Sequence, residues 1–140
     1  MSASGPPATP TPPPVSVKPG DTFILDPKGG TNPHIWVVLA VDSPDMCEDW
    51  AIIVSITSLK PETRKFADLT CVVDVGDHPF LTHESYVYYG DIQEVEVRRL
   101  LGGLGARHQP CSAGFLKRLR EGVHVSPRTK KRFKSRVPRS

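Results

Sequence analysis

The stretch HIWVVLAVDSPDMCEDWAIIVSITSL, residues 34–59, decides the fold of this chain. It contains two nearly continuous apolar runs, 34–42 and 50–59, which are rich in β-branched residues and are separated by the polar loop SPDMCED. Runs of this length and composition are typical of strands that are buried on both faces. Joined by a short loop, they predict the central antiparallel pair of a small sheet.

Shorter strand-like segments flank this pair. GDTFIL (20–25) places a Gly-Asp turn before a short strand, and the loop DPKGGTNP (26–33) leads from it into the central pair. LTCVVDV (69–75) and SYVYYGD (85–91) predict two further strands. No helix is predicted among the first four strands. The pattern therefore favours a mainly β fold, a small SH3-like antiparallel barrel of five or more strands, over a doubly wound sheet.

Helical patterns appear only late in the chain. DIQEVEVRRLLGG (91–103) fits either a short helix or a last strand. CSAGFLKRLREGV (111–123) predicts a C-terminal helix, with Ser112 as its N-cap and Gly122 as a left-handed residue at its end.

The two ends differ from this domain in composition. Seven of the fifteen prolines lie in residues 1–19, so residues 1–17 are predicted to be a disordered, extended arm. Residues 117–140 carry ten Lys and Arg against one acid, and residues 126–140 are predicted to be a disordered basic tail. The folded domain is accordingly expected over residues 18–125.

Composition also limits the class of protein. No apolar run is long enough to span a bilayer, and the first residues lack the basic and apolar regions of a signal peptide. The three cysteines have no CxxC spacing, which argues against a disulfide framework or a structural zinc site. We expect a soluble cytoplasmic protein with reduced thiols and no cofactor.

The candidate catalytic residues are His34, His78, His83 and Thr57. In a small barrel, the loop before the second strand and the loop between the fourth and fifth strands would open at the same end. His34 would then lie near His78 or His83, with Thr57 at the end of the neighbouring strand. Imidazole suits proton transfer because its ordinary pKa is near neutrality, at about 6.5.

Other readings of these residues stay open. A single histidine in a turn is more often structural than catalytic, and His78 before Pro79 fits that role. Asp77, His78, His83 and Glu84 offer enough ligands for a metal ion, but neighbouring strand residues point to opposite faces. Ser85 beside His83 lacks the strained elbow of a serine nucleophile.

Aromatic and basic residues indicate a nucleic-acid partner. Tyr86 and Tyr88 share one strand face, where they would either pack in the core or stack on bases, and Tyr89 takes the other face. A basic tail binds phosphates chiefly by counterion release. The residues expected to hold RNA are Lys28, Tyr86, Tyr88, Lys130, Lys131 and Arg132.

The order of GDTFIL, a glycine-bearing loop, HIWVVLAV, AIIVSITS and a final helix after a glycine-rich turn resembles the PemK/MazF-type toxin family over residues 18–123. The resemblance implies an SH3-like barrel that cuts single-stranded RNA without a metal ion, and it implies a homodimer and an antitoxin as partners. Thr57 in Ser-Ile-Thr-Ser stands where the family has a functional hydroxyl. His34 stands where the family has an arginine, and residues 1–59 contain no arginine.

Three functions follow for testing. The first is a metal-independent endoribonuclease of a toxin–antitoxin system, with His34 and His83 as the acid–base pair and Thr57 orienting the phosphate. The second is a non-catalytic SH3-like adaptor that binds nucleic acid or protein, which the missing arginine favours. The third is a small metal-dependent hydrolase.

Overall fold

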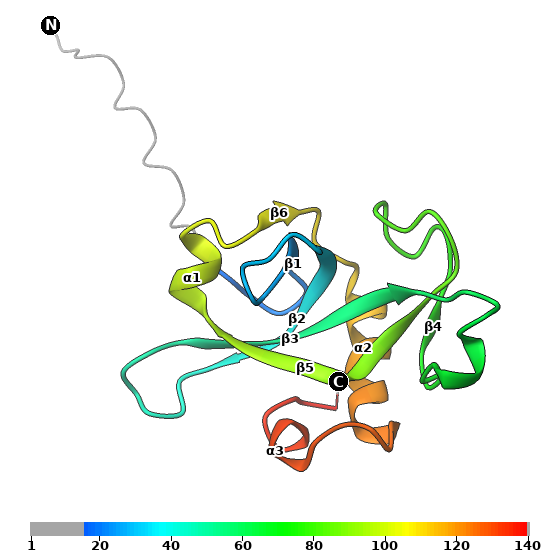
Figure 1. Cartoon of the computed structure of the whole chain (residues 1–140). Helices are drawn as coiled ribbons and strands as arrows, with labels where there is room; N and C mark the ends of the chain where they lie inside the picture. The colour runs from blue at the N-terminus through cyan, green and yellow to red at the C-terminus, as the bar shows by residue number, and fades with distance from the viewer. Residues whose placement is uncertain (1–15, 140) are drawn as a thin grey trace, which may run out of the picture.

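The structure, a computed structural model, describes residues 16–139 and is built on one curled antiparallel sheet (Figure 1). Its six strands lie in the order β4-β5-β3-β2-β1-β6. The sequence forms them over β1 (Thr22–Leu25), β2 (His34–Asp42), β3 (Trp50–Ser58), β4 (Val72–Val73), β5 (Ser85–Glu96) and β6 (Ala106–His108). The prediction of a mainly β, barrel-like antiparallel fold with a C-terminal helix is confirmed.

The central pair forms as its composition predicts. β2 and β3 are antiparallel, and both are buried along most of their length because both faces of the sheet carry apolar side chains. On one face, Ile35, Val54 and Val87 belong to a core that α2 (Ala113–Val125) covers with Phe115 and Leu119. On the other face, a second core contains Phe23, Trp36 and Ile53.

A break in the register of β5 curls the sheet. Ile53 pairs with Gln93, but Ser55, only two residues further along β3, pairs with Tyr88. The extra residues of β5 bulge out of the ladder, and bulges increase the local bend and twist of a sheet.

The helical region agrees with the prediction only in part. Residues 91–103 contain both suggested elements, since β5 runs to Glu96 and α1 (Val97–Leu101) follows directly. The Ser112 hydroxyl accepts a hydrogen bond from the Phe115 N–H at 3.1 Å, as expected for an N-cap. Gly122 does not end the helix: α2 continues to Val125, and Gly122 is buried against Tyr89.

The predicted disorder of residues 126–140 is wrong for residues 126–139. This segment contains a short helix, α3 (Lys131–Lys134), below the sheet and α2 (Figure 1). Phe133 and Val137, 1% and 3% exposed, insert into the α2-covered core. The prediction of disorder was based on the excess of Lys and Arg and did not take these two apolar residues into account. Most of the arm predicted over residues 1–17 lies outside the described residues; Val17 is buried against the second core.

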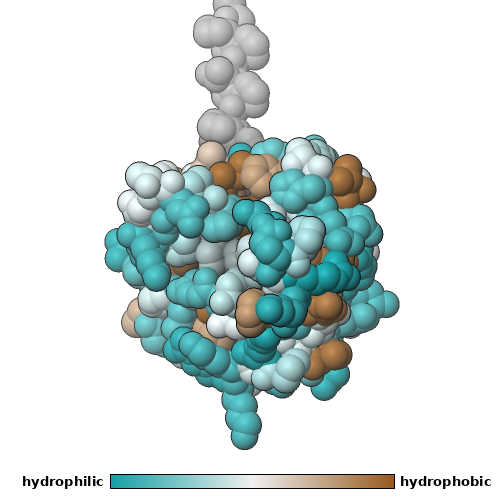
Figure 2. Space-filling view, turned by 45° about the vertical axis from the view of Figure 1, so that its right-hand side comes forward, coloured by the Kyte–Doolittle hydropathy of each residue, from teal (hydrophilic) through white to brown (hydrophobic). Residues whose placement is uncertain are grey.

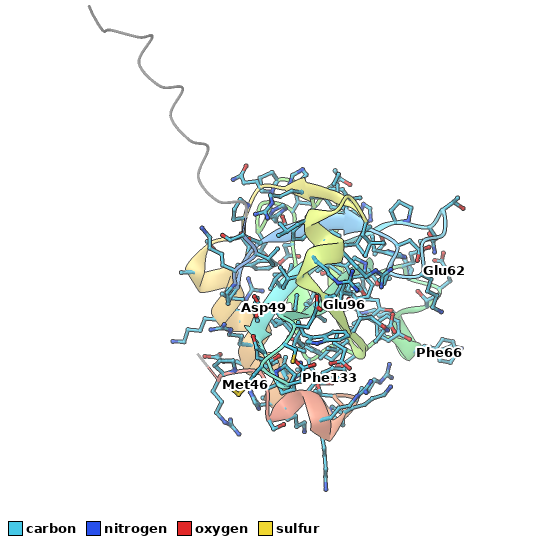
Figure 3. All side chains as sticks on the ribbon, turned by 90° about the vertical axis from the view of Figure 1, so that its left-hand side faces the viewer. Met46, Asp49, Glu62, Phe66, Glu96 and Phe133 are labelled. Atoms are coloured by element: carbon cyan, nitrogen blue, oxygen red, sulfur yellow. The ribbon has the colours of Figure 1, made fainter. Side chains whose placement is uncertain are left out.

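The charged part of the same segment is also anchored. Arg136 forms two hydrogen bonds with the Asp42 carboxylate, at 2.8 and 2.7 Å, and one of 2.6 Å with Glu94. These ion pairs raise the pKa of the Arg136 guanidinium. Figure 3 shows α3 at the base of the molecule, with Phe133 directed toward the interior.

Candidate functional site

A pocket of about 450 Å³ opens where β2 begins, β3 ends and β5 begins. Its wall and floor combine apolar residues with imidazole and hydroxyl groups: Pro33, His34, Ile35, Ile56, Ser58, Phe80, Leu81, Thr82, His83 and Ser85. We call this the histidine pocket. His34 borders it at the start of β2, where pairing with Leu25 places the His34 side chain on the Trp36 face of the sheet, and His83 lies in the loop before β5. Two histidines that are 49 positions apart in the sequence therefore line one cavity.

His83 is held at both ring nitrogens by hydroxyl groups. Its Nε2 lies 2.5 Å from the Ser58 Oγ, and its Nδ1 lies 3.1 Å from the Thr82 Oγ1. A hydroxyl can donate or accept, so this arrangement accommodates either neutral tautomer of the ring. The imidazole is exposed and can meet a ligand in the pocket. A histidine with both ring nitrogens oriented in an open cavity is suited to proton transfer.

Thr57 does not share this pocket. Ile56 and Ser58 line the cavity, and successive side chains of a strand point to opposite faces. Thr57 pairs with Tyr86 and lies on the other face of the sheet. Ser58, and not Thr57, contacts His83, whereas Thr57 shares its face with His34. A joint site of His34, His83 and Thr57 stays a prediction. Both faces of β3 carry apolar side chains, so the sequence pattern does not indicate which of the two neighbouring hydroxyl residues faces the pocket.

His78 is a structural residue that positions the loop carrying His83. It is 2% exposed, and its Nδ1 accepts a hydrogen bond from the Phe80 N–H at 3.1 Å. The proton therefore resides on Nε2, which donates to the Gln109 carbonyl at 2.6 Å. With both nitrogens engaged and the ring buried, His78 presents no free ring nitrogen to a substrate.

The four residues considered as metal ligands are directed to four different partners. Asp77 pairs with Arg118, His78 with Gln109, His83 with Ser58 and Glu84 with Arg64. Among residues 16–139, no three His, Cys, Asp or Glu side chains are grouped in a way that could hold a metal ion.

The tyrosine pair lies on the Thr57 face of the sheet, away from the histidine pocket. The rings of Tyr86 and Tyr88 have centroids 6.0 Å apart, and Tyr88 is 38% exposed, while Tyr89 is buried on the opposite face. Burial, followed by the proximity of Tyr88, raises the pKa of the Tyr86 hydroxyl. This pair is available for stacking on the face of the sheet that also carries Thr57.

The predicted RNA-binding lysines and arginine occupy two separate places. Lys28 lies in the β1–β2 loop next to His34, in a neighbouring cavity. Lys130, Lys131 and Arg132 are exposed on and just before α3. Arg136 ties that region to Asp42, the last residue of β2, whereas His34 is the first. His34 and Asp42 are thus separated by about 26 Å of strand, at a rise of about 3.3 Å per residue, and the basic segment is anchored at the end of β2 that is far from the pocket.

The surface around these sites is mixed. Figure 2 shows hydrophobic side chains scattered among hydrophilic ones over the face that it presents. Within the part of the chain that the structure describes, no helix has the length and apolar character needed to cross a bilayer.

Comparison of the chain with protein-family models, with curated proteins and with solved structures gives no match. The resemblance to PemK/MazF-type toxins consequently rests on the sequence motifs alone. The geometry of the histidine pocket is the remaining basis for a function.

Proposed function

We propose that the protein is an endoribonuclease that cuts single-stranded RNA at the histidine pocket, in the manner of PemK/MazF-type toxins. The observation that carries this proposal is the convergence of His34 and His83 on one cavity, with Ser58 bound to His83. Two histidines that border one cavity can supply both proton transfers of RNA cleavage without help from a metal ion.

The reaction assigns one role to each histidine. His83 removes the proton of the ribose 2′-hydroxyl at Nε2, where the Ser58 hydroxyl now lies. The 2′-oxygen attacks phosphorus, and the bond from phosphorus to the 5′-oxygen breaks. His34, as imidazolium, donates its proton to that leaving oxygen. The products are a 2′,3′-cyclic phosphate and a 5′-hydroxyl end.

The pocket supplies further groups for this reaction. Ser58 keeps the His83 ring in place before substrate binds and then donates a hydrogen bond to a phosphate oxygen. Ile35, Ile56 and Leu81 form an apolar floor that limits access of water. In surroundings of low polarity, hydrogen bonds to a developing negative charge are strengthened.

The test is incubation of the purified protein with a mixed single-stranded RNA pool in EDTA. His34→Gln and His83→Gln should each lower the cleavage rate by about 10²–10⁴, the usual contribution of one acid or base. Cleavage that requires an added divalent metal, or full activity in either variant, would contradict the mechanism.

Two neighbouring hydroxyl residues provide a matched control. Ser58 lines the pocket and Thr57 lies on the opposite face of the same strand. Ser58→Ala should slow cleavage more than Thr57→Ala, because only Ser58 contacts His83. The reverse result would show that the hydroxyl needed for cleavage lies on the Thr57 face of the sheet.

A binding function without cleavage is the second candidate. It is favoured by the exposed Tyr88 ring beside Tyr86, because an open aromatic pair on a strand face can stack on bases. RNA that is retarded in a gel but stays intact, with binding lost in Tyr88→Ala and retained in His83→Gln, would support this adaptor function over the nuclease.

The biological prediction of the nuclease proposal is toxicity on induced expression. Growth arrest should depend on His83 and should be relieved by a partner that covers the histidine pocket, as an antitoxin would. A homodimer stays a prediction that sedimentation of the purified chain measures directly.

A further inference from the structure

His34 also lines a second cavity on its other side, of about 200 Å³, which we call the loop pocket. Its polar lining comes from the β1–β2 loop and from β5: Asp26, Lys28, Asn32, Asp91 and Gln93. His34 thus separates two adjoining spaces. A substrate cut at His34 would place one neighbouring group in each of them.

The loop that forms one wall is held in shape by its own hydrogen bonds. The Asp26 carboxylate accepts the Lys28 N–H at 2.9 Å and the Asn32 N–H at 3.3 Å. Gly29 adopts a φ of 74°, and a Cβ at Gly30 would lie 2.6 Å from an Asp26 oxygen. The loop is therefore ordered before any ligand binds, which lowers the entropic cost of recognition.

The side chains of this loop are free to bind a ligand. Within residues 16–139, the Lys28 ammonium and the Asn32 side-chain amide form no hydrogen bond or ion pair, and both residues are exposed. Both groups donate hydrogen bonds. One wall of the loop pocket therefore presents donors.

The opposite wall presents acceptors. The Gln93 amide Nε2 donates to the Asp91 Oδ1 at 2.7 Å, which fixes the orientation of both side chains. The second oxygen of Asp91 and the Oε1 of Gln93 are left to accept hydrogen bonds. A ligand that fits both walls carries adjacent donors on one side and an acceptor on the other.

Guanine has this pattern on its Watson–Crick edge, where N1–H and N2–H lie next to O6. Adenine, cytosine and uracil each lack the pair of adjacent donors. We propose that the loop pocket binds a guanine base of the RNA, with its N1–H and N2–H donating to the free oxygens of Asp91 and Gln93 and its O6 accepting from Lys28 or Asn32. RNA bases are commonly recognised in this way, through their Watson–Crick edges.

This inference rests on the proposed function and names its substrate: the enzyme cuts RNA beside a guanine. The base in the loop pocket fixes the register of the strand, so that the neighbouring phosphate lies at His34. Asp91 and Asn32 are then specificity-determining residues, and they take no part in proton transfer.

The primary test measures binding rather than cleavage. The four nucleoside 5′-monophosphates are titrated separately into the ¹⁵N-labelled full chain, and the side-chain amide signals of Asn32 and Gln93 are followed by NMR. GMP should bind at least about tenfold more tightly than AMP, CMP or UMP, because a good bidentate contact discriminates by about 1–3 kcal/mol. Equal affinities, or shifts confined to Tyr88 and its neighbours, would overturn the assignment.

Two variants with the same change of charge sharpen this test. Asp91→Asn replaces one acceptor oxygen by a donor with little change in shape and should remove the preference for GMP. Glu62→Gln, an exposed acid on the loop after β3 (Figure 3), should leave it unchanged. Retention of the GMP preference in Asp91→Asn would refute the role of that carboxylate.

Mapping of the cleavage sites separates this inference from the nuclease proposal. Cuts beside guanine in the wild type, spread over all bases in Asp91→Asn, support both. Cuts without base preference, together with equal binding of the four nucleotides, overturn the guanine site but leave the nuclease intact. Preferential GMP binding without any RNA cleavage keeps the guanine site and overturns the nuclease.

Discussion

The packing of the C-terminal segment predicts that Phe133→Ala destabilises the whole domain. Phe133 is 1% exposed and lies in the same core as Leu119, while the Arg132 guanidinium lies 4.6 Å from its ring centroid. Truncating a buried phenylalanine to alanine costs about 3–5 kcal/mol, from lost burial and from the cavity that is left. A domain of this size is stable by only about 5–15 kcal/mol in total.

Urea unfolding monitored by tryptophan fluorescence measures this loss. With a slope of about 2 kcal/mol per M, the transition midpoint should fall by roughly 1.5–2.5 M. Phe66→Ala is the matched control, because Phe66 is 67% exposed and points outward (Figure 3). That variant should change the stability by no more than about 0.5 kcal/mol.

The comparison also distinguishes a folded from a disordered C-terminal segment. If residues 126–139 were detached from the domain, Phe133→Ala and Phe66→Ala would have equally small effects, and the packing described above would be refuted. Should Phe133→Ala fail to fold, Phe133→Leu, which retains most of the apolar volume, is expected to lose about 1 kcal/mol and keeps the question measurable.

Gly122→Ala should destabilise the domain although alanine favours helices, because the added Cβ would lie 1.8 Å from the buried Tyr89 hydroxyl; thermal unfolding by circular dichroism measures this, and an unchanged melting temperature would contradict the contact. Burial alone would raise the pKa of the Asp68 carboxyl, but hydrogen bonds from two hydroxyl groups outweigh it and lower the pKa below 3.8. Its ionised form therefore contributes stability above about pH 4 that is lost as the pH falls through the lowered pKa; Asp68→Asn should cost about 1–3 kcal/mol at pH 7, with the difference from wild type shrinking in urea titrations below pH 4. Burial raises the pKa of the Cys111 thiol to about 11, so Cys111 should react with iodoacetamide far more slowly at pH 8 than the exposed Cys47, and peptide mass mapping that finds equal rates would refute this.

The composition of the central strands was sufficient to predict their place in the fold. Continuous β-branched runs over 34–42 and 50–59 can bury both faces only in the middle of a sheet, and β2 and β3 lie there. The N-cap at Ser112 could also be predicted from nearby residues alone, because it needs only a hydroxyl group beside the first free N–H groups of a helix. Such features are determined over a few residues, and the sequence alone determines them.

Long-range packing decided the remaining features. The excess of basic residues led to the prediction that the C-terminal segment is separate from the domain. Phe133 and Val137 nevertheless pack in the core. Only the tertiary structure provides the space that these two side chains fill. The end of α2 shows the same limitation. Gly122 is placed inside the helix by close contact with Tyr89, a residue that is distant in sequence.

The sequence indicated which histidines are candidates for the site, but it did not indicate how the side chains of the site are arranged. The meeting of His34 with His83 follows from strand order, which the sequence suggested, whereas the choice between Thr57 and Ser58 follows from strand parity. Because both faces of β3 are apolar, the sequence pattern is the same for either parity. Only the tertiary structure determines that Ser58 contacts His83 while Thr57 shares its face with His34.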